Sequence, residues 1–285
     1  MKKNLAQFFQ NRTIAIATMH QKERALAPLL ENRLGLKYIV PEQFNTDFFG
    51  TFSGEIARSD SQVETARMKC LQAMKLTGLD IGIASEGSFG PHPTLFFLPA
   101  DLETLVFIDT KNNIELVVHE CSTETNFTGN TINTEEELMA FAKAIGFPKH
   151  GLILRPEQQT FKDQIKGIHS WKQLKMHWQK LAEKYGSMYA ETDMRAFVNP
   201  TRMKVIAKTA QKLVDIVENQ CPSCSWPGFS IESSSAGLPC NRCSLPTKSI
   251  LANKYLCKNC DFSEDIKYPN GKQTEDPMYC DFCNP

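Results

Sequence analysis

The sequence has no apolar run of the roughly 18 residues that a membrane-spanning helix requires. It also lacks an apolar stretch after the basic start Met1-Lys2-Lys3, because polar residues interrupt Asn4–Gln10, and this argues against a secretory signal peptide. We therefore expect a cytoplasmic protein, a compartment in which thiols stay reduced.

A net charge is also missing, since 32 basic residues balance 32 acidic ones. The charges are unevenly distributed, however. Residues 143–212 contain 14 basic and 5 acidic side chains, whereas residues 1–142 contain 12 basic and 18 acidic ones. The basic segment can face an anionic ligand, or it can pair with the acidic first part of the chain, which is the more ordinary arrangement.

Short apolar runs that alternate with segments of helical periodicity indicate an α/β fold. We expect a mixed sheet flanked by helices, followed by a small zinc-ribbon-type domain, with the boundary between residues 1–219 and 220–285. Helices are predicted where capping signals enclose apolar periodicity: 24–34, 62–77, 135–145, 169–185 and 200–218. Strands are predicted at 13–18, 36–40, 79–84, 95–98, 102–109, 114–120, 151–154 and 187–192.

The apolar strand 79–84 stops in a stretch of Gly, Ser and Pro that contains Glu86 and His92. Loops at the carboxyl ends of buried strands are where open α/β sheets bind their ligands. We therefore place Glu86 at the centre of a candidate site, with Ser85 and Ser88 as ligand-binding neighbours.

The turn between the first predicted strand and its helix carries Thr18, His20 and Lys22. Backbone N–H groups at a helix start favour anions, so these three side chains are candidate phosphate contacts. In the alternative interpretation, Lys22 is a solvated charge of the first helical turn and His20 is a cap.

An aromatic, glycine-broken segment, 43–58, offers two carboxylates and a guanidinium. Asp47 and Glu55 could hold Mg²⁺ together with Glu86, because carboxylate oxygens are ligands that this ion prefers. Arg58 could bind a phosphate or a carboxylate.

A second polar junction precedes the helix 200–218. Asp193, Arg195, Asn199 and Arg202 lie within ten residues of one another there, and Asn199 before Pro200 is a good helix cap. An arginine near a helix start is a candidate second clamp for phosphate, although an Asp193/Arg195 pair can also be structural.

The most specific pattern is a set of four Cys-x-x-Cys pairs after residue 220. The pairs are separated by 15, 13 and 19 residues, and the first and last of these gaps fit the C-x₂-C-x₁₅₋₂₀-C-x₂-C zinc pattern. Each pair offers two thiolates, so eight cysteines complete two tetrahedral Zn²⁺ sites. Adjacent pairs, nested pairs and a cross-brace all use the same ligands: Cys221, Cys224, Cys240, Cys243, Cys257, Cys260, Cys280 and Cys283.

The cysteine-rich tail is short of large apolar residues, so we expect the metal to supply much of its folding free energy. From Cys221 onward there are 6 basic and 7 acidic residues, and two tetrathiolate sites add further negative charge. Such a surface repels nucleic acid. We expect instead a structural role or contact with a partner protein.

Three phrases together resemble an uncharacterised bacterial family, a domain of unknown function with a cysteine-rich C-terminus. They are TMHQKE at 18–23, ASEGSFGPHP at 84–93 and ETDMRAFVNPTRM at 191–203. This resemblance covers nearly the whole chain and implies no known activity.

A fainter resemblance is to the inosine triphosphate pyrophosphatase-like superfamily. The matching pieces are Thr18 with Lys22, Glu64-Thr65 with Arg67, Glu86-Gly87, and the hairpin 102–120. The resemblance implies that the acidic loop binds Mg²⁺ and the lysine binds phosphates. The chain departs from the pattern at Met19 and His20, where those enzymes have an asparagine.

Two functions follow as hypotheses. The first is a Mg²⁺-dependent hydrolase of a nucleotide or another phosphorylated metabolite, in which His20 or His92 assists proton transfer and Lys22, Arg195 and Arg202 neutralise phosphates. The second is a module that binds a small anion without turnover, with its zinc tail contacting a partner protein. Nucleic-acid binding through the basic segment ranks last.

Overall fold

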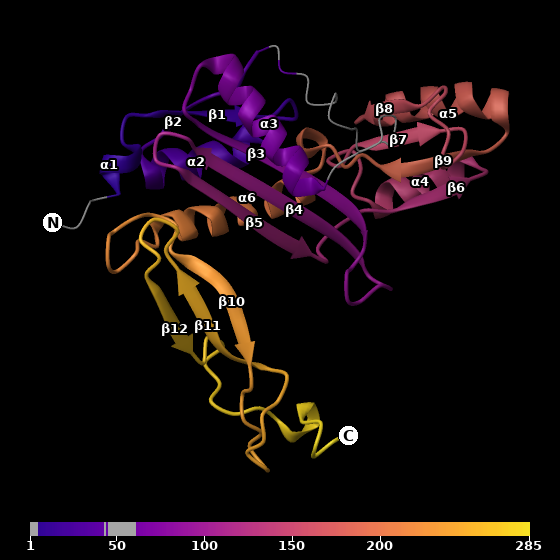
Figure 1. Cartoon of the computed structure of the whole chain (residues 1–285). Helices are drawn as coiled ribbons and strands as arrows, with labels where there is room; N and C mark the ends of the chain where they lie inside the picture. Colours follow the sequence, from indigo (N-terminus) through magenta and orange to yellow (C-terminus); the bar gives the residue numbers. More distant parts are fainter. Residues whose placement is uncertain (1–4, 43, 45–60) are drawn as a thin grey trace. The chain divides into compact units, whose positions relative to one another are not determined.

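A computed structural model describes residues 5–42, 44 and 61–285 (Figure 1). Its contacts divide the described chain into two units, Gln10–Leu213 and a second formed by the residues up to Phe9 together with Val214–Pro285. The expected mixed α/β architecture with flanking helices and a small cysteine-rich C-terminal part is confirmed.

The first sheet of the larger unit mixes parallel and antiparallel strands. Its strand order is β2-β1-β3-β4-β5, and β1 pairs in parallel with both β2 and β3, whereas β3, β4 and β5 pair antiparallel. The strands are β1 (Thr13–Ala17), β2 (Lys37–Ile39), β3 (Ile81–Pro91), β4 (Pro99–Asp109) and β5 (Ile114–Ser122). Helices make the parallel crossovers, and short turns make the antiparallel pairs.

The crossover helices begin and end within one residue of the predicted bounds. Helix α2 (Glu23–Leu34) ends at Gly35, whose φ of 67° is the left-handed conformation that glycine adopts most readily. Helix α3 (Gln62–Thr77) begins after Ser61, whose side chain accepts a hydrogen bond from the Glu64 amide, and ends at Gly78. The inner face of α3 packs on the alanine-rich surface of β1 and β3 and on Val106 and Ile108 of β4.

The predicted loop after residue 84 is wrong. Strand β3 continues through Glu86 to Pro91, because every residue from Ile81 to Pro91 has a partner on β4. The expected strand at 95–98 is part of the turn that joins β3 to β4, and Phe96 and Phe97 are exposed there. Gly, Ser and Pro favour a loop locally, but cross-strand pairing outweighs that preference.

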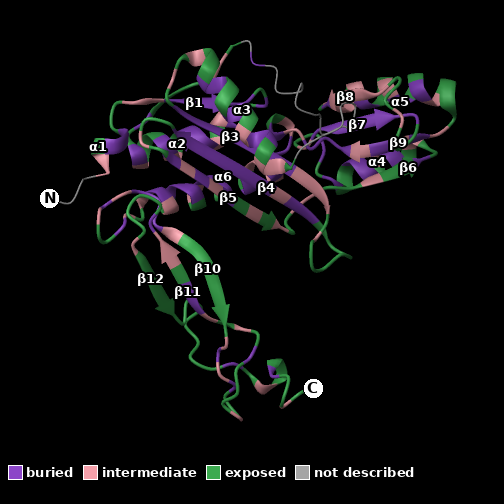
Figure 2. Ribbon diagram, in the orientation of Figure 1, coloured by how far each residue is buried: buried purple, intermediate pink, exposed green. Residues whose placement is uncertain are grey.

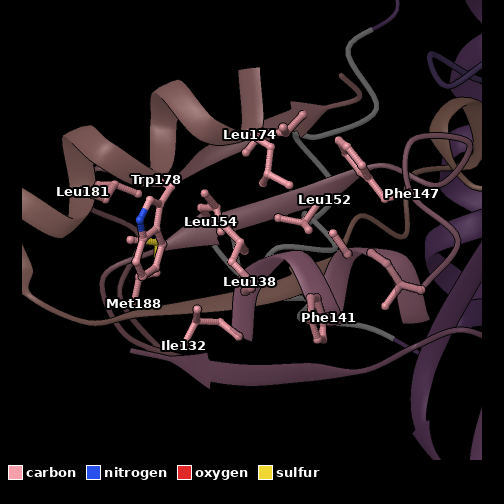
Figure 3. Packing of buried hydrophobic residues seen from close by; sticks show 14 residues of the cluster. Ile132, Leu138, Phe141, Phe147, Leu152, Leu154, Leu174, Trp178, Leu181 and Met188 are labelled. Carbon is pink, nitrogen blue, oxygen red and sulfur yellow. The ribbon is translucent and has the colours of Figure 1, made fainter. Parts of the chain in front are cut away.

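A second, antiparallel sheet has the order β6-β9-β7-β8. Helices α4 (Glu135–Ala144) and α5 (Trp171–Tyr185) contribute Leu138, Phe141, Leu174 and Trp178 to its hydrophobic core (Figure 3). Its strands are β6 (Gly129–Ile132), β7 (Leu152–Arg155), β8 (Ile165–Ile168) and β9 (Met188–Thr192). Strand β6 is not among the strands predicted from the sequence. Its residues are largely polar, and it is an edge strand that pairs only with β9 among the described strands.

Helix α6 (Pro200–Glu218) begins after a short 3-10 turn, Ala196–Val198. Asn199 caps it as predicted, because its Oδ1 accepts the Arg202 amide at 3.0 Å. The helix also contacts the first sheet, since Arg202 pairs with Glu103 of β4 and Lys212 with Glu120 of β5.

The smaller unit contains helix α1 (Ala6–Phe9) and an antiparallel sheet of order β10-β11-β12. Its strands are β10 (Ser230–Ala236), β11 (Ile250–Leu256) and β12 (Ser263–Lys267). Strands β10 and β12 are largely exposed, whereas β3 and β4 are largely buried (Figure 2). Within the described ranges, no helix is long and apolar enough to span a bilayer.

Candidate functional site

A cluster of buried polar side chains lies where β1 ends beside β3. The parallel pairing of these strands ends at Ala17 and Ala84, so the next residues of β3 border the Thr18–Lys22 turn. Thr18 Oγ1 holds this turn by accepting the amides of His20 (3.1 Å) and Lys22 (3.3 Å). The turn thereby directs Lys22 Nζ to the carbonyl oxygen of Ser85, at 3.0 Å.

On the α3 side of the sheet, Glu86 pairs with Lys69. Glu86 lies two residues after Ala84 on β3, so both side chains point to the same face, toward α3. Glu86 Oε1 accepts a hydrogen bond from Lys69 Nζ. Both side chains are buried. A buried charge pair of this kind is costly to break, because the remaining partner would be left uncompensated.

On the opposite side of the sheet, Arg202 of α6 pairs with Glu103 of β4. Arg202 Nε donates to Glu103 Oε1 at 2.6 Å, Nη1 donates to the Met194 carbonyl at 2.6 Å, and both charged side chains are fully buried. Gly87, opposite Glu103, leaves the space for them, because a Cβ there would lie 2.5 Å from Glu103 Oε1 and 2.6 Å from Arg202 Nη2.

Lys22 differs from Lys69 and Arg202, the other two buried cations of this cluster, in its partners. In the described part of the chain, its ammonium group has a hydrogen bond to Ser85 but no ion pair within 4.0 Å, although the residue is only 5% exposed. Burial, followed by the positive charge of Arg202, lowers the pKa of Lys22 to about 8, against the opposing effect of Glu103 and Glu86.

Asp101 is a carboxyl group in a comparable position. It lies two residues before Glu103 on β4, it is completely buried, and neither of its oxygens has a hydrogen-bond partner among the described residues. Burial, with a smaller contribution from Glu103, raises the pKa of Asp101 to about 8. The buried Ser85 hydroxyl also has no partner in the ranges that the structure describes.

His20 stacks on Phe197, with ring centroids 5.7 Å apart, and the Arg195 guanidinium lies over the same phenyl ring at 5.0 Å. Burial, and then the charges of Lys22, Arg202, Arg195 and Lys69, lower the pKa of His20 to about 3. The histidine is therefore neutral near pH 7.

The three predicted polar segments thus meet: the Thr18–Lys22 turn, the Ser85–Glu86 part of β3, and the 191–203 junction. Asp193 and Asn199 use their polar atoms internally, since Asp193 accepts from Gly167 and Arg195 while Asn199 binds Asn126 and caps α6.

Two predicted residues on β3 and its turn lie further along. Ser88 is half-buried two positions after Glu86. His92 lies six residues beyond Glu86 on an extended strand, about 20 Å away. Its Nδ1 accepts the amides of Thr94 and Leu95, so it stabilises the turn and does not join the cluster. Asp47, Glu55 and Arg58 lie outside the described residues.

Sequence reasoning missed Asp101, Glu103 and the role of Lys69 in the cluster. One signal was present for the carboxylates: Asp101 and Glu103 are two residues apart at the start of an apolar strand, so they share one face of the sheet. No such pattern marks Lys69, because a lysine in an amphipathic helix is expected on its exposed face.

The eight tail cysteines form two tetrads in the smaller unit. One comprises Cys221, Cys224, Cys257 and Cys260, and the other comprises Cys240, Cys243, Cys280 and Cys283. The first pair therefore joins the third and the second joins the fourth, which is the cross-brace among the three arrangements that the spacing allowed. The first tetrad packs against Trp226, Phe229, Tyr255 and Phe262.

The strand topology explains this pairing. Strand β10 follows the first cysteine pair, β11 follows the second and β12 follows the third. Because β10, β11 and β12 run antiparallel, successive pairs alternate between the two ends of the sheet. Pairs one and three therefore meet at one end, and pairs two and four meet at the other.

The sulfur geometry suits a tetrahedral metal ion. Across the tetrads the Sγ–Sγ distances are 3.6 Å for Cys224–Cys257 and Cys243–Cys280, 3.8 Å for Cys221–Cys260 and 3.9 Å for Cys240–Cys283. A zinc ion with Zn–S bonds of about 2.3 Å requires sulfur atoms about 3.8 Å apart. Both tetrads can thus hold a metal ion with little rearrangement.

Comparison with known protein families identifies the family of the chain. A family model described as a domain of unknown function, DUF6671, matches residues 69–285, and the chain belongs to this family. No curated protein matches the chain. Neither comparison supports the resemblance to inosine triphosphate pyrophosphatases. The match spans Lys69, Glu86 and all eight tetrad cysteines.

Proposed function

We propose that the larger unit binds a small oxyanion, such as a phosphorylated metabolite, at Lys22, beside the buried pairs Lys69–Glu86 and Arg202–Glu103. The observation that carries this proposal is Lys22, a buried ammonium group whose hydrogen-bond partner within the described residues is a neutral carbonyl. An isolated buried charge is costly, so a bound anion would stabilise it.

The surroundings support an anion over a cation. Lys69 pairs with Glu86 and Arg202 with Glu103, whereas Lys22 has no ion pair within 4.0 Å among the described residues and is the cation that an anion would compensate. Lys22 also directly precedes α2, and the amides at a helix N-terminus favour negative charge. Met19 and Phe197, on the adjoining turns, are exposed, so the ligand would approach there.

Thermal unfolding with increasing phosphate, pyrophosphate or sulfate tests the proposal. Saturable stabilisation is expected, since a ligand at 100 times its Kd adds about 2.7 kcal/mol to the free energy of unfolding. Lys22→Met should abolish this effect. Lys75→Met, a change at an exposed position of α3, should retain it. The absence of saturable stabilisation by any of these anions, or its persistence in Lys22→Met, would contradict the proposal.

Hydrolysis of the bound metabolite is the second candidate. It is favoured by the burial of Glu86, Glu103 and Asp101 beside the cationic groups, since such carboxyl groups can hold Mg²⁺ or move protons. Release of phosphate or pyrophosphate from a panel of phosphorylated metabolites, with and without Mg²⁺, decides between binding and turnover. A panel without turnover would leave anion binding alone.

For the smaller unit we propose two structural zinc ions, one in each cysteine tetrad. Four thiolates fill the coordination of each ion, which leaves no position for substrate. Metal analysis of reduced protein should give two zinc ions per chain. Contact with a partner protein stays a prediction, and the exposed Met278, Tyr279 and Phe282 near the second tetrad are where it would be tested first.

A further inference from the structure

We propose that the two cysteine tetrads hold their metal ions differently. The first tetrad is a permanent folding site, and the second is an exchangeable metal site whose occupancy orders the C-terminal segment 276–285. This inference rests on the zinc ions proposed above and goes beyond them, because it assigns a separate role to each ion. The geometry that carries it is the way in which each tetrad is connected to the rest of the smaller unit.

The sulfur atoms themselves are arranged alike in the two tetrads. The Sγ–Sγ distances between pairs are 3.6 and 3.8 Å in the first tetrad and 3.6 and 3.9 Å in the second. Each tetrad has two buried cysteines, and the one exposed tetrad cysteine, Cys260, belongs to the first. A difference in metal retention therefore has to come from the surroundings of the thiolates.

Each Cys-x-x-Cys pair and the turn after it form a knuckle, and the fourth knuckle is the least firmly closed. In the first three, the amide of the first cysteine donates to the carbonyl oxygen five residues later, at Trp226, Leu245 and Phe262. The residue after their second cysteine has a φ of 56° to 61°. Among the described C-terminal residues, the fourth knuckle lacks both features, since the Cys280 amide donates back to Pro277. Its two thiolates are thus less preorganised for a metal ion.

Apolar packing encloses the first tetrad. Phe229 is buried, and its ring centroid lies 5.5 Å from that of Tyr255 and 5.9 Å from that of Phe262. Trp226, two residues after the first cysteine pair, packs edge-on against Phe8 of α1, with centroids 5.1 Å apart. An apolar shell of this kind limits the access of water and chelators to a metal ion.

The large apolar side chains on the knuckles of the second tetrad are exposed instead: Leu245, Met278, Tyr279 and Phe282. The segment 276–285 is connected to the second knuckle by a surface ion pair, Lys248–Asp281 at 2.9 Å, in which both side chains are largely exposed. Such a pair contributes at most about 1 kcal/mol. The preceding Glu275 is held more firmly, because its backbone bonds both Pro239 and Asn241. Beyond Glu275, the metal ion is therefore the main link.

The first tetrad also has a side-chain donor to sulfur. Asn259 Nδ2 of the third knuckle lies 3.6 Å from Sγ of Cys224 in the first knuckle and donates to it. A hydrogen bond of this kind stabilises the thiolate charge and fixes the orientation of the ligand. The corresponding residue of the fourth knuckle is Phe282, whose side chain has no donor.

Release of zinc from the reduced full-length protein to an excess of a coloured chelator tests the inference. We expect two phases of one ion each, the first about ten- to a hundredfold faster than the second. Cys243→Ser with Cys280→Ser should remove the fast phase and keep the slow one. Hydrogen exchange measured after one ion has left should show that residues 276–285 have lost protection while residues 221–229 keep it.

Asn259→Ala should accelerate the slow phase about tenfold and leave the fast phase unchanged, because it removes a donor to the first tetrad alone. Asn241→Ala is the matched control at an exposed asparagine of the second knuckle, whose side chain contacts no sulfur among the described residues, and it should change neither phase. A slow phase that Asn259→Ala leaves unchanged would contradict the role of this amide.

Release of both ions in a single phase, or a fast phase that persists in the Cys243/Cys280 variant, would overturn the assignment. If that variant does not fold, hydrogen exchange of the wild type decides, and protection lost first at residues 221–229 contradicts the inference. Two ions that leave together refute this inference and leave the proposed zinc sites intact. Reduced protein that contains no zinc as purified refutes both.

Discussion

At the scale of single residues, Lys22 determines how we interpret the larger unit. A lysine in the first turn of a helix is usually solvated, yet this one is buried against the carbonyl of Ser85. Its pKa is lowered from 10.5 to about 8, so the folded state binds its proton less tightly than the unfolded state does. The charged group is thus a cost to folding, retained at the position where an anion would remove that cost.

Replacing Lys22 tests this cost directly. Below pH 8 both folded and unfolded states carry the proton, and the folded protein loses roughly 3 kcal/mol relative to a lysine with an unshifted pKa. This cost disappears as the pH rises from 8 to 10.5, so the lysine makes the wild type gain stability in that range. Lys22→Met should therefore raise the free energy of unfolding at pH 7 by about 1–3 kcal/mol and remove this rise. Urea denaturation at pH 7 and 10 measures both effects.

Lys75→Met is the matched control, because Lys75 is exposed and its replacement should leave both values within about 0.5 kcal/mol of the wild type. A lower stability of Lys22→Met at pH 7 would mean that the ammonium group holds the fold together, against our interpretation.

The sequence predicted some residues of the buried polar cluster but not others, for a physical reason. Lys22 and Arg202 were found because they follow predicted strand and helix boundaries. Asp101 was missed because its burial depends on β5 and on α6, which lies a hundred residues away. The lowered pKa of His20 could not be foreseen for the same reason, since its burial and the four cations that lower its pKa come together only in the folded chain.

At the scale of elements, the continuous strand β3 joins both faces of the cluster. Its alternation directs Glu86 toward α3, while Gly87 faces the Arg202–Glu103 pair. Helices were predicted well, because Ser61, Gly35, Gly78 and Asn199 are local capping signals. Strand β3 beyond Ala84 was not, because its strand character comes from β4, which no local pattern reveals.

Gly87→Ala probes the close approach of β3 to α6. The added methyl group would lie 2.5 Å from Glu103 Oε1 and 2.6 Å from Arg202 Nη2, so a fully buried ion pair would have to move. We expect a loss of about 1–3 kcal/mol in the free energy of unfolding, measured in urea.

Gly90→Ala, three residues along the same strand, provides the comparison, since a Cβ there meets nothing within 4 Å. It should leave stability unchanged or slightly increased, because alanine restricts the unfolded chain more than glycine does. Equal effects of the two substitutions would show that the Glu103–Arg202 contact does not constrain this strand.

At the scale of the whole molecule, the cysteine pattern predicted the ligands but not their pairing. Spacing along the sequence allowed three arrangements, and only the antiparallel strands between the pairs select one. The choice lies in the three-dimensional path of the chain, so no inspection of Cys-x-x-Cys spacing could have made it.

The metal content of double-substituted variants tests which cysteine pairs share an ion. Cys224→Ser with Cys257→Ser removes two ligands from one tetrad, so one zinc ion per chain should remain. Cys224→Ser with Cys243→Ser damages both tetrads, so both ions should be lost or bound weakly. Metal analysis after exhaustive dialysis measures the difference.

Cys121→Ser should keep the full metal content, because Cys121 belongs to neither tetrad. If the Cys224/Cys257 variant loses both ions while the Cys224/Cys243 variant keeps one, the first and second pairs share an ion and the cross-brace is wrong.

The interleaved order of the cysteine pairs has a consequence for proteolysis. Wherever a protease cuts once between two successive cysteine pairs, at least one bound metal ion would still bridge the two pieces, because at least one tetrad has a cysteine pair on either side of every such cut. The nicked chain should therefore elute as one species under native conditions and separate only after a chelator is added. Were neighbouring pairs to share an ion, a cut between Cys243 and Cys257 would free the C-terminal piece at once.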